Sequence, residues 1–361
     1  MDTIFDPACL GDIHLGSRLV MSGMTRQRAD ADGAPNDLMT AYYRQRVSAG
    51  LIITESTHPS WLGKNQPCSP HLITDADQQA WHHLVDAVHE EGGTIVVQLM
   101  HAGGNAHPSV NGGHAPVAPT DVIPTDEIRV GPTVLPHERP EPLTVAGMEA
   151  IAKEFARAAQ RAVDAGFDGV EIHAGNGFLL HQFLSPHTNT RTDEYGGTPR
   201  NRCRFPVSVV RAVTDAVGAS RVGLRLSPGA SITSLQEPDL LDQYRELLGH
   251  PELAELAYVH TTSTSDPEII EQLRSVWHGG WIHNMGTDPR QSPSETLAQA
   301  TDVLARSADA VSIGRLFISN PDLPRRLATD STLTPPDFTT FYTGAEHGYT
   351  DYPFLTPEVT P

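Results

Sequence analysis

The chain has 361 residues, a formal net charge of −19 at pH 7 and a hydrophobic fraction of 39%. A strongly acidic surface repels phosphate backbones and anionic lipids, so neither a nucleic acid nor a membrane is expected as a partner. The N-terminal stretch has no basic, apolar leader, and no run approaches the roughly 20 apolar residues of a membrane span. We therefore expect a single cytoplasmic domain over residues 1–361.

Cysteine and histidine spacing gives no sign of a metal site. Cys9, Cys68 and Cys203 form no CxxC pair, and the 18 histidines show no HExxH or comparable spacing. Structural zinc sites depend on such spacing, and the odd number of cysteines argues against a disulfide framework. We expect neither in this chain.

Short apolar runs recur along the chain, separated by amphipathic stretches. The runs cover residues 18–24, 51–56, 94–100, 169–175, 221–227, 256–262, 280–286 and 310–316. Continuous apolar runs of this length favour strands that are buried on both faces of a parallel sheet. The clearest helical patterns, residues 75–92 and 148–166, both end at Gly. Thr74 or Asp75 is the expected cap of the first helix, and Thr144 precedes the second.

Eight strands that alternate with helices predict an α/β fold of the (β/α)₈ barrel type, the TIM barrel. The alternative is a doubly wound sheet, which needs a GxGxxG turn after its first strand. The sequence MSGMTRQRA at residues 21–29 does not supply that turn. The barrel is therefore the favoured fold.

Residues 102–143 interrupt the alternation and are dense in Pro and Gly. Because they follow the third strand, they are predicted to form a lid over the C-terminal mouth of the barrel, with a small hairpin. The alternative is a surface loop that has no functional role. The tail from Thr332 onward is rich in aromatic residues and is expected to pack back on the body.

Polar side chains stand in or just after the apolar runs, where barrel strands converge on one mouth. They are Thr25, Gln98, His173, Arg225 and Arg315. Taken alone, Gln98 would be a satisfied core amide and Arg225 half of a structural ion pair with Glu171. A buried Gln or Arg without a partner costs several kcal/mol. Their convergence on one rim favours a polar ligand in the mouth.

The ends of the last two strands, HNMGTDP and SIGRLF, combine Gly with a polar or basic residue. In many barrels these loops bind a phosphate group through backbone N–H groups. A phosphate-binding site at one side of the mouth, with an Arg and a Gln near its centre, suits flavin mononucleotide (FMN). The charge that reduction places near N1 of its ring would be stabilised by an Arg.

The chain resembles the Old Yellow Enzyme family of FMN-dependent ene-reductases nearly end to end. The segments that carry the resemblance include RLVMSGMTR, LMTAYYRQRVSAGLIITEST, AGFDGVEIHAGNGFLLHQFLSPHTNTRTDEYGG, RVGLRLSP and ADAVSIGRLFISNPDLPRRL. Thr25 stands where another branch has Cys, so the chain is similar to the classical branch. The resemblance implies a barrel with an N-terminal β-hairpin cap, non-covalent FMN and NAD(P)H as the reductant.

The resemblance also implies a role for individual residues. The cofactor-binding positions are Gly23, Met24, Thr25, Ser56, Gln98, Arg225, Gly286, Thr287, Gly314 and Arg315. Among them Thr25 bonds near O4 of the flavin, Gln98 bonds the pyrimidine edge and Arg225 faces N1 and O2. The two Gly pairs, Gly286-Thr287 and Gly314-Arg315, hold the phosphate.

His173 and Asn176 are implied to donate hydrogen bonds to the carbonyl oxygen of the substrate. In typical members a Tyr then delivers a proton to the α-carbon, but this chain has Phe178 there, and Phe cannot donate a proton. Met100 stands where Trp is frequent, and Gln66 stands where a Tyr often lines the pocket. These changes affect the substrate side of the site.

Three functions remain open from the sequence. The first is an NAD(P)H-dependent ene-reductase that obtains its proton from water or from another pocket residue, such as Tyr342 or His101. The second is a specialised biosynthetic flavoenzyme that dehydrogenates, isomerises or reduces an iminium. The third is a non-catalytic flavin-binding protein. The natural substrate, the choice of NADH or NADPH, and a monomeric or dimeric state are also open.

Overall fold

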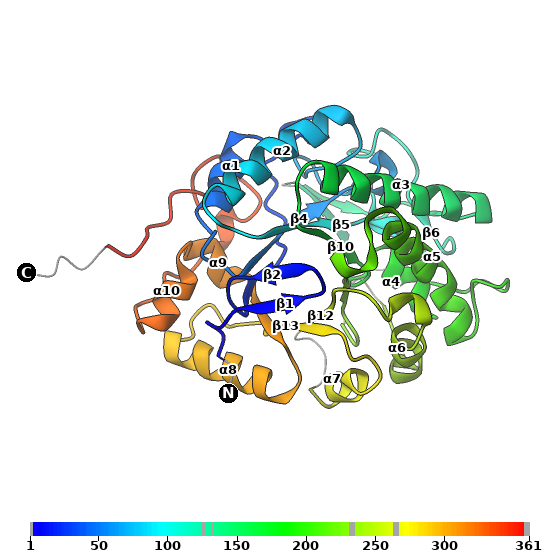
Figure 1. The fold of residues 1–361 in the computed structure, drawn as a ribbon. Helices are drawn as coiled ribbons and strands as arrows, with labels where there is room; N and C mark the ends of the chain where they lie inside the picture. The colour runs from blue at the N-terminus through cyan, green and yellow to red at the C-terminus, as the bar shows by residue number, and fades with distance from the viewer. Residues whose placement is uncertain (1–2, 125–126, 132, 231–234, 263–266, 357–361) are drawn as a thin grey trace, which may run out of the picture.

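The computed structural model describes residues 3–124, 127–131, 133–230, 235–262 and 267–356. Within these ranges the centre of the fold is a closed barrel of eight parallel strands (Figure 1). The strands, in barrel order, are β10 (Gly169–His173), β11 (Val222–Leu226), β12 (Tyr258–Thr262), β13 (Gly280–Asn284), β14 (Ala310–Ile313), β3 (Leu19–Met21), β4 (Leu51–Thr57) and β5 (Ile95–Leu99). Each predicted apolar run coincides with one of them to within a few residues, so the predicted (β/α)₈ barrel is confirmed.

Helices surround the barrel (Figure 1). They are α1 (Asp37–Arg44), α2 (Asp75–His89), α3 (Val145–Asp164), α4 (Leu179–Leu184), α5 (Pro199–Val217), α6 (Leu240–Leu248), α7 (Pro267–Arg274), α8 (Pro293–Arg306), α9 (Arg315–Ser319) and α10 (Leu323–Ala328). No helix in the described residues is long and apolar enough to cross a membrane.

Both helix starts that the sequence indicated depend on a threonine. Thr74 caps α2 by accepting the backbone N–H of Asp77, whose carboxylate accepts the N–H of Thr74 in return. Thr144 caps α3 by accepting the N–H of Gly147. Helix α3 therefore begins at Val145, three residues before the start that apolar periodicity predicted, because the cap and not the first apolar residue sets the boundary.

The N-terminal hairpin closes one end of the barrel. Its antiparallel strands are β1 (Ala8–Leu10) and β2 (Ile13–Leu15). Leu10, Ile13 and Leu15 are buried in one cluster with inward-facing strand residues such as Val20 and Val96. This apolar plug fills the N-terminal end, which leaves the C-terminal end as the open mouth.

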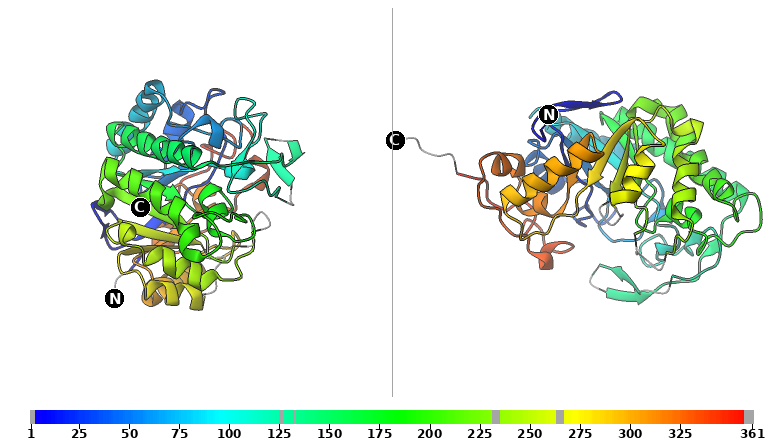
Figure 2. Two further views of the ribbon diagram at one scale, coloured as in Figure 1. Left: turned by 90° about the vertical axis from the view of Figure 1, so that its right-hand side faces the viewer. Right: turned by 90° about the horizontal axis from the view of Figure 1, so that it is seen from below.

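A second hairpin lies at the opposite end of the barrel from the first (Figure 2). It is built from β7 (Glu127–Val130) and β8 (Thr133–Pro136), which pair antiparallel within residues 102–143. Two short strands, β6 (Val117–Ala118) and β9 (Glu141–Pro142), pair at its base. The predicted small hairpin is therefore present beside the mouth.

The C-terminal tail packs against the loop that follows β3. The Tyr349 ring stacks on the Tyr42 ring with centroids 4.1 Å apart. The buried guanidinium of Arg26 donates to the carbonyl oxygens of Phe341, at 3.1 Å, and Gly348, at 2.7 Å. These contacts bring η5 (Phe338–Thr340) and the following residues to the rim of the mouth.

Candidate active site

An inner cavity of about 370 Å³ opens at the C-terminal ends of β3, β11, β13 and β14. Its wall combines backbone, hydroxyl, amide and guanidinium groups from Ser22, Gly23, Met24, Asn176, Arg225, Thr262, Asn284, Gly286, Thr287, Gly314 and Arg315. All but four of these residues are predicted cofactor-binding positions. The four that are not are Ser22, Asn176, Thr262 and Asn284.

Arg225 is the principal charged group of this wall, and it is 6% exposed. Its Nη1 donates to Ser22 Oγ at 2.9 Å, and Asn284 Nδ2 donates to the same oxygen at 3.0 Å. The Nε–H of Arg225 is buried and has no partner among the described residues. A buried donor without a partner is costly, so the wall suits a ligand with acceptor atoms or negative charge.

Gln98 has partners within the protein, as its burial requires. Its Oε1 accepts from Ser56 Oγ at 3.0 Å, and its Nε2 donates to Glu171 Oε1 at 2.7 Å. Glu171 pairs with His260 at 2.8 Å. No ion pair between Glu171 and Arg225 appears among the described residues, so the ion pair considered from sequence is not formed.

The backbone at Gly23 lies against β4 more closely than a side chain would allow. A Cβ atom at this position would lie 2.6 Å from the carbonyl oxygen of Thr54 and 3.0 Å from Gln98 Nε2. Glycine therefore lets the chain run flat along the cavity wall. This packing leaves no room for a side chain at position 23.

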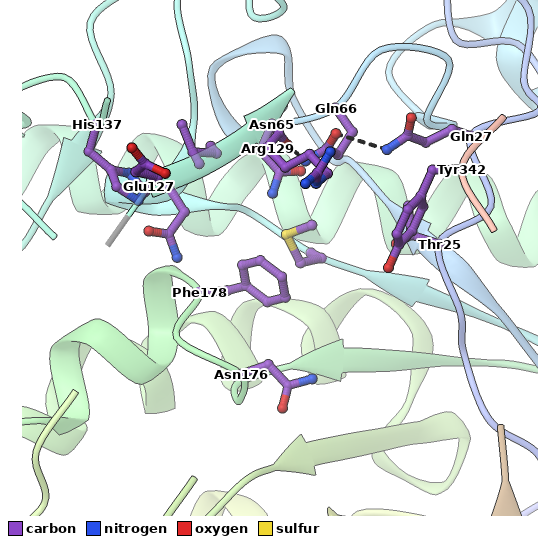
Figure 3. A pocket seen from close by; sticks show the side chains of 13 residues that line it. Thr25, Gln27, Asn65, Gln66, Glu127, Arg129, His137, Asn176, Phe178 and Tyr342 are labelled. Atoms are coloured by element: carbon purple, nitrogen blue, oxygen red, sulfur yellow. Dashed lines mark hydrogen bonds between the residues drawn. The ribbon is translucent and has the colours of Figure 1, made fainter. Parts of the chain in front are cut away.

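An outer cavity of about 530 Å³ lies beside the inner one, and Asn176 lines both. Figure 3 shows the outer cavity, with the Phe178 ring pointing into it close to Asn176. Three of the four predicted pocket residues lie on its wall, namely Gln66, Met100 and Tyr342. The β7–β8 hairpin contributes Glu127, Ile128 and Arg129, so the predicted lid segment forms part of this wall.

His101, the fourth predicted pocket residue, is 1% exposed and lines neither cavity. Its Nδ1 accepts the N–H of Gly103 at 3.0 Å, and its ring lies against Gly63. Burial lowers the pKa of His101 to about 3, so the ring is neutral at physiological pH. These contacts fit a structural residue behind the wall.

His173 lies beside Asn176, the residue that lines both cavities, but is itself 3% exposed and lines neither. His173 Nδ1 accepts the N–H of Gly175 at 3.2 Å, which places the ring proton on Nε2. Burial, reinforced by the charge of Arg225, lowers the pKa of His173 well below its ordinary value, so the ring stays neutral. His173 Nε2 and Asn176 Nδ2 are 3.4 Å apart. Two donors this close can share one acceptor.

The backbone of Asn176 has φ = 52°, in the left-handed region. Asn adopts this conformation more readily than most residues do. Its N–H donates to Ser227 Oγ at 2.6 Å, which holds the turn after β10 in place. The sharp turn is what brings position 176 back beside the strand-end histidine.

Several wall residues were not identified from the sequence. Ser22 Oγ accepts from both Arg225 and Asn284. Asn284 ends β13 as other polar residues end their strands, so the same reasoning could have found it. No sequence pattern marked the polar residues of the outer wall, because they come from separate loops. These are Gln27, Asn65, Asn105, Glu127, Arg129 and His137.

Comparisons with known proteins agree with this geometry. The sequence pattern of the NADH:flavin oxidoreductase / NADH oxidase family matches residues 3–333. The flavin oxidoreductase hxnT of Emericella nidulans is 38% identical over 98% of each chain. The 12-oxophytodienoate reductase 1 of Oryza sativa subsp. japonica is 37% identical over 98% of this chain and 93% of its own. Morphinone reductase in complex with tetrahydroNAD superimposes with a TM-score of 0.93 and 39% identity, covering 100% of each chain.

With this barrel, this mouth and this extent of similarity, the chain belongs to the NADH:flavin oxidoreductase / NADH oxidase family, that of the Old Yellow Enzymes, and is an FMN-dependent oxidoreductase.

Proposed function

We propose that the protein uses NAD(P)H to reduce the C=C bond of an α,β-unsaturated carbonyl compound in the outer cavity, with FMN held non-covalently in the inner one. The reaction consumes NAD(P)H and a proton, and it adds two hydrogens across the double bond. When bound, FMN supplies the hydride chemistry. The observation that carries the proposal is the neutral His173 beside Asn176, the residue that lines both cavities.

The inner cavity suits FMN for reasons of donor chemistry. The unpartnered Nε–H of Arg225 would meet an acceptor or the negative charge of a reduced flavin ring. Gly286, Thr287, Gly314 and Arg315 line one side of the cavity, where backbone N–H groups and a guanidinium would hold a phosphate. Gly23 leaves the wall flat for a planar ring.

His173 and Asn176 would bind the substrate carbonyl and stabilise the negative charge that grows on its oxygen as hydride reaches the β-carbon. A donor of this kind contributes about 3 kcal/mol to transition-state stability. A neutral imidazole donates without a change of charge, so this role does not depend on protonation of His173 near neutral pH.

The proton for the α-carbon would come from water or from Tyr342. Phe178 has no acidic hydrogen, and the neutral, buried His101 is no acid at this pH. Tyr342 lines the same cavity as Phe178 and is 46% exposed, so its hydroxyl can be resupplied from solvent. Thr25, a predicted cofactor-binding residue, lines this outer cavity and not the inner one.

The experiment is anaerobic stopped-flow spectroscopy of the FMN-loaded protein. NADH and NADPH, tested separately, should bleach the flavin absorbance, and 2-cyclohexenone should then restore it. Bleaching with no recovery by any enone would exclude enone reduction and favour the second candidate. No bleaching by either nucleotide would leave a flavin-binding protein without this activity.

The second candidate is a specialised dehydrogenation, isomerisation or iminium reduction, and Phe178 is the observation that favours it. A substrate that needs no proton at the α-carbon would make the missing Tyr irrelevant. The apolar surface of Phe178 against Met100 also suits a bulky substrate. Recovery of the bleached flavin by a cyclic iminium, but by no enone, would support this candidate.

A further inference from the structure

A fully buried carboxylate, Glu171, lies inside the barrel. It is in the middle of β10, it is 0% exposed, and it is paired in register with Gln98 of β5 and Gly223 of β11. An ionised carboxylate in a protein interior costs several kcal/mol of desolvation unless specific partners offset it. A barrel core needs no such group, since apolar side chains fill the same space at lower cost.

The partners of Glu171 keep it ionised. Its Oε1 accepts from Gln98 Nε2 at 2.7 Å, and its Oε2 accepts from His260 Nδ1 at 2.8 Å. His260 Nε2 in turn accepts from Ser312 Oγ at 2.8 Å. Burial alone would raise the pKa of Glu171, but His260, Arg225 and Gln98 together lower it to about 2. Burial also lowers the pKa of His260, so this imidazole is neutral and the negative charge lies on Glu171.

This charge determines which way the Gln98 amide points. With the amide reversed, its oxygen would face a carboxylate oxygen at hydrogen-bond distance, and its NH₂ group would face the Ser56 hydroxyl. Gln98 Nε2 also lies against Gly23, a wall residue of the inner cavity. One N–H of Gln98 is therefore used by Glu171, and the other is left as a donor beside the wall.

Glu171 also acts on the nearby guanidinium group of Arg225. Burial lowers the pKa of Arg225 below its ordinary value, and the attraction to Glu171 offsets part of that lowering. No described ion pair joins them directly, so Glu171 acts on Arg225 through its field and leaves the Nε–H free. A ligand beside Arg225 would experience less positive potential than the guanidinium alone would give.

We propose that Glu171 is a positioning residue for the cofactor: it fixes the donor orientation of Gln98 at the wall of the inner cavity, and its charge, opposing that of Arg225, lowers the midpoint potential of bound FMN. This inference rests on the proposed function, in which the inner cavity holds FMN. It assigns a purpose to a charge that the stability of the barrel does not require.

The test is Glu171→Gln, which keeps the size of the side chain and removes its charge. Apoprotein is titrated with FMN by fluorescence quenching, and the midpoint potential of the loaded protein is measured by dye-coupled reduction. The dissociation constant of FMN should rise by about fivefold, the effect of one hydrogen bond lost. The midpoint potential should become more positive. A folded variant with an unchanged potential and a dissociation constant within about twofold of wild type would overturn the inference.

Asp77→Asn is the matched control. Asp77 also forms a buried carboxylate–imidazole pair, with His71 at 3.0 Å, but neither residue lines the two cavities. This variant should lower the melting temperature without changing the potential.

If Glu171→Gln does not fold, Glu171→Asp tests the inference in its place. It keeps the charge, but its side chain is too short to hold Gln98. It should weaken FMN binding while leaving the potential near that of wild type, and tight FMN binding would contradict the inference.

A double-mutant cycle separates positioning from general stability. In a Gln98→Ala background, Glu171→Gln should change the dissociation constant of FMN by less than about twofold, because the residue it positions is gone. The potential should still rise, since the field of Glu171 does not pass through Gln98. An additive loss of affinity would indicate a merely structural role. Wild-type protein that binds no FMN would instead refute the proposed function itself.

Discussion

At the scale of single residues, Phe178 gives the site an aromatic ring without a hydroxyl group. Phe178 stands at the start of α4 with its ring edge-on to His173, the centroids 5.0 Å apart. The resemblance indicates a Tyr at this position. The ring therefore keeps its packing role but cannot act as an acid, and the site retains the donors that would polarise a carbonyl.

Phe178→Tyr tests whether proton delivery limits turnover. General acid catalysis contributes about 10²- to 10⁴-fold, so the variant should reoxidise reduced FMN with 2-cyclohexenone at least about tenfold faster. Stopped-flow absorbance measures this rate. Phe5→Tyr, near the N-terminus and 36% exposed, is the matched control and should have no effect. An unchanged rate in Phe178→Tyr would mean that the proton already arrives by another route, and Tyr342→Phe should then slow the wild-type reaction.

Asn176 combines a backbone role with a side-chain role, and two substitutions separate them. Asn176→Gly keeps the left-handed turn at φ = 52°, while Asn176→Ala strains it by roughly 1 kcal/mol. Both remove the amide donor. We expect both to weaken the binding of an enone or a phenol to the loaded protein to the same degree, and only Asn176→Ala to lower the melting temperature clearly. Tighter binding by the Gly variant would show that the backbone, and not the amide, matters for the ligand.

At the scale of secondary-structure elements, periodicity and composition predicted the barrel strands because each is a continuous apolar run between polar turns. Residues such as His173 and Arg225 could be placed at the mouth, since strand ends in a barrel converge. The outer wall could not be predicted in this way. It brings Gln27, Asn65 and Glu127 together from loops whose paths depend on long-range packing. The Glu171–His260 pair was missed for a similar reason, because its partners come from different strands.

The loop between β3 and α1 is held by a carboxylate of β4, which gives a pH dependence. Glu55 accepts the backbone N–H groups of Arg26, at 3.0 Å, and Gln27, at 3.4 Å, and it is 0% exposed. Burial raises the pKa of Glu55 to about 7, although its hydrogen bonds from the backbone and the charges of nearby arginines act to lower it. The folded protein thus holds this proton where the unfolded chain, with an ordinary pKa of 4.5, has lost it.

The stability that Glu55 contributes is therefore fully present below pH 4.5 and is lost as the pH rises through about 7. Glu55→Gln cannot ionise, so its free energy of unfolding relative to wild type should increase by about 1 kcal/mol per pH unit across that window. Urea unfolding of the apoprotein at several pH values measures this difference. Buried histidines such as His58, whose pKa is lowered to about 3, affect the free energy of unfolding of both proteins equally, so they do not change the difference. A difference that is constant with pH would contradict the raised pKa.

At the scale of the whole molecule, the C-terminal tail helps to form the mouth of the barrel, while the N-terminal hairpin closes the opposite end. The family pattern ends at residue 333, yet the following tail supplies Tyr342 to the outer cavity. Buried arginines hold this tail by its carbonyl groups. Arg28 donates to the carbonyl oxygen of Thr340 at 2.7 Å, and Arg46 donates to that of Tyr349 at 3.4 Å. Both guanidinium groups are at most 4% exposed.

Removal of residues 336–361 should therefore lower the free energy of unfolding by much more than the loss of buried apolar surface alone would. The truncation would remove the tail carbonyl oxygens that accept hydrogen bonds from the buried side chains of Arg26 and Arg28. A buried charge that loses its partner costs about 3–5 kcal/mol. We expect a clear fall in the melting temperature of the apoprotein and a faster loss of FMN on gel filtration. Phe354→Ala, at a tail position that is 50% exposed, is the control and should leave both unchanged. A truncated protein with the melting temperature of wild type would mean that water can replace the tail carbonyl groups as hydrogen-bond acceptors for the arginines. The tail would then contribute to the outer wall but not to stability.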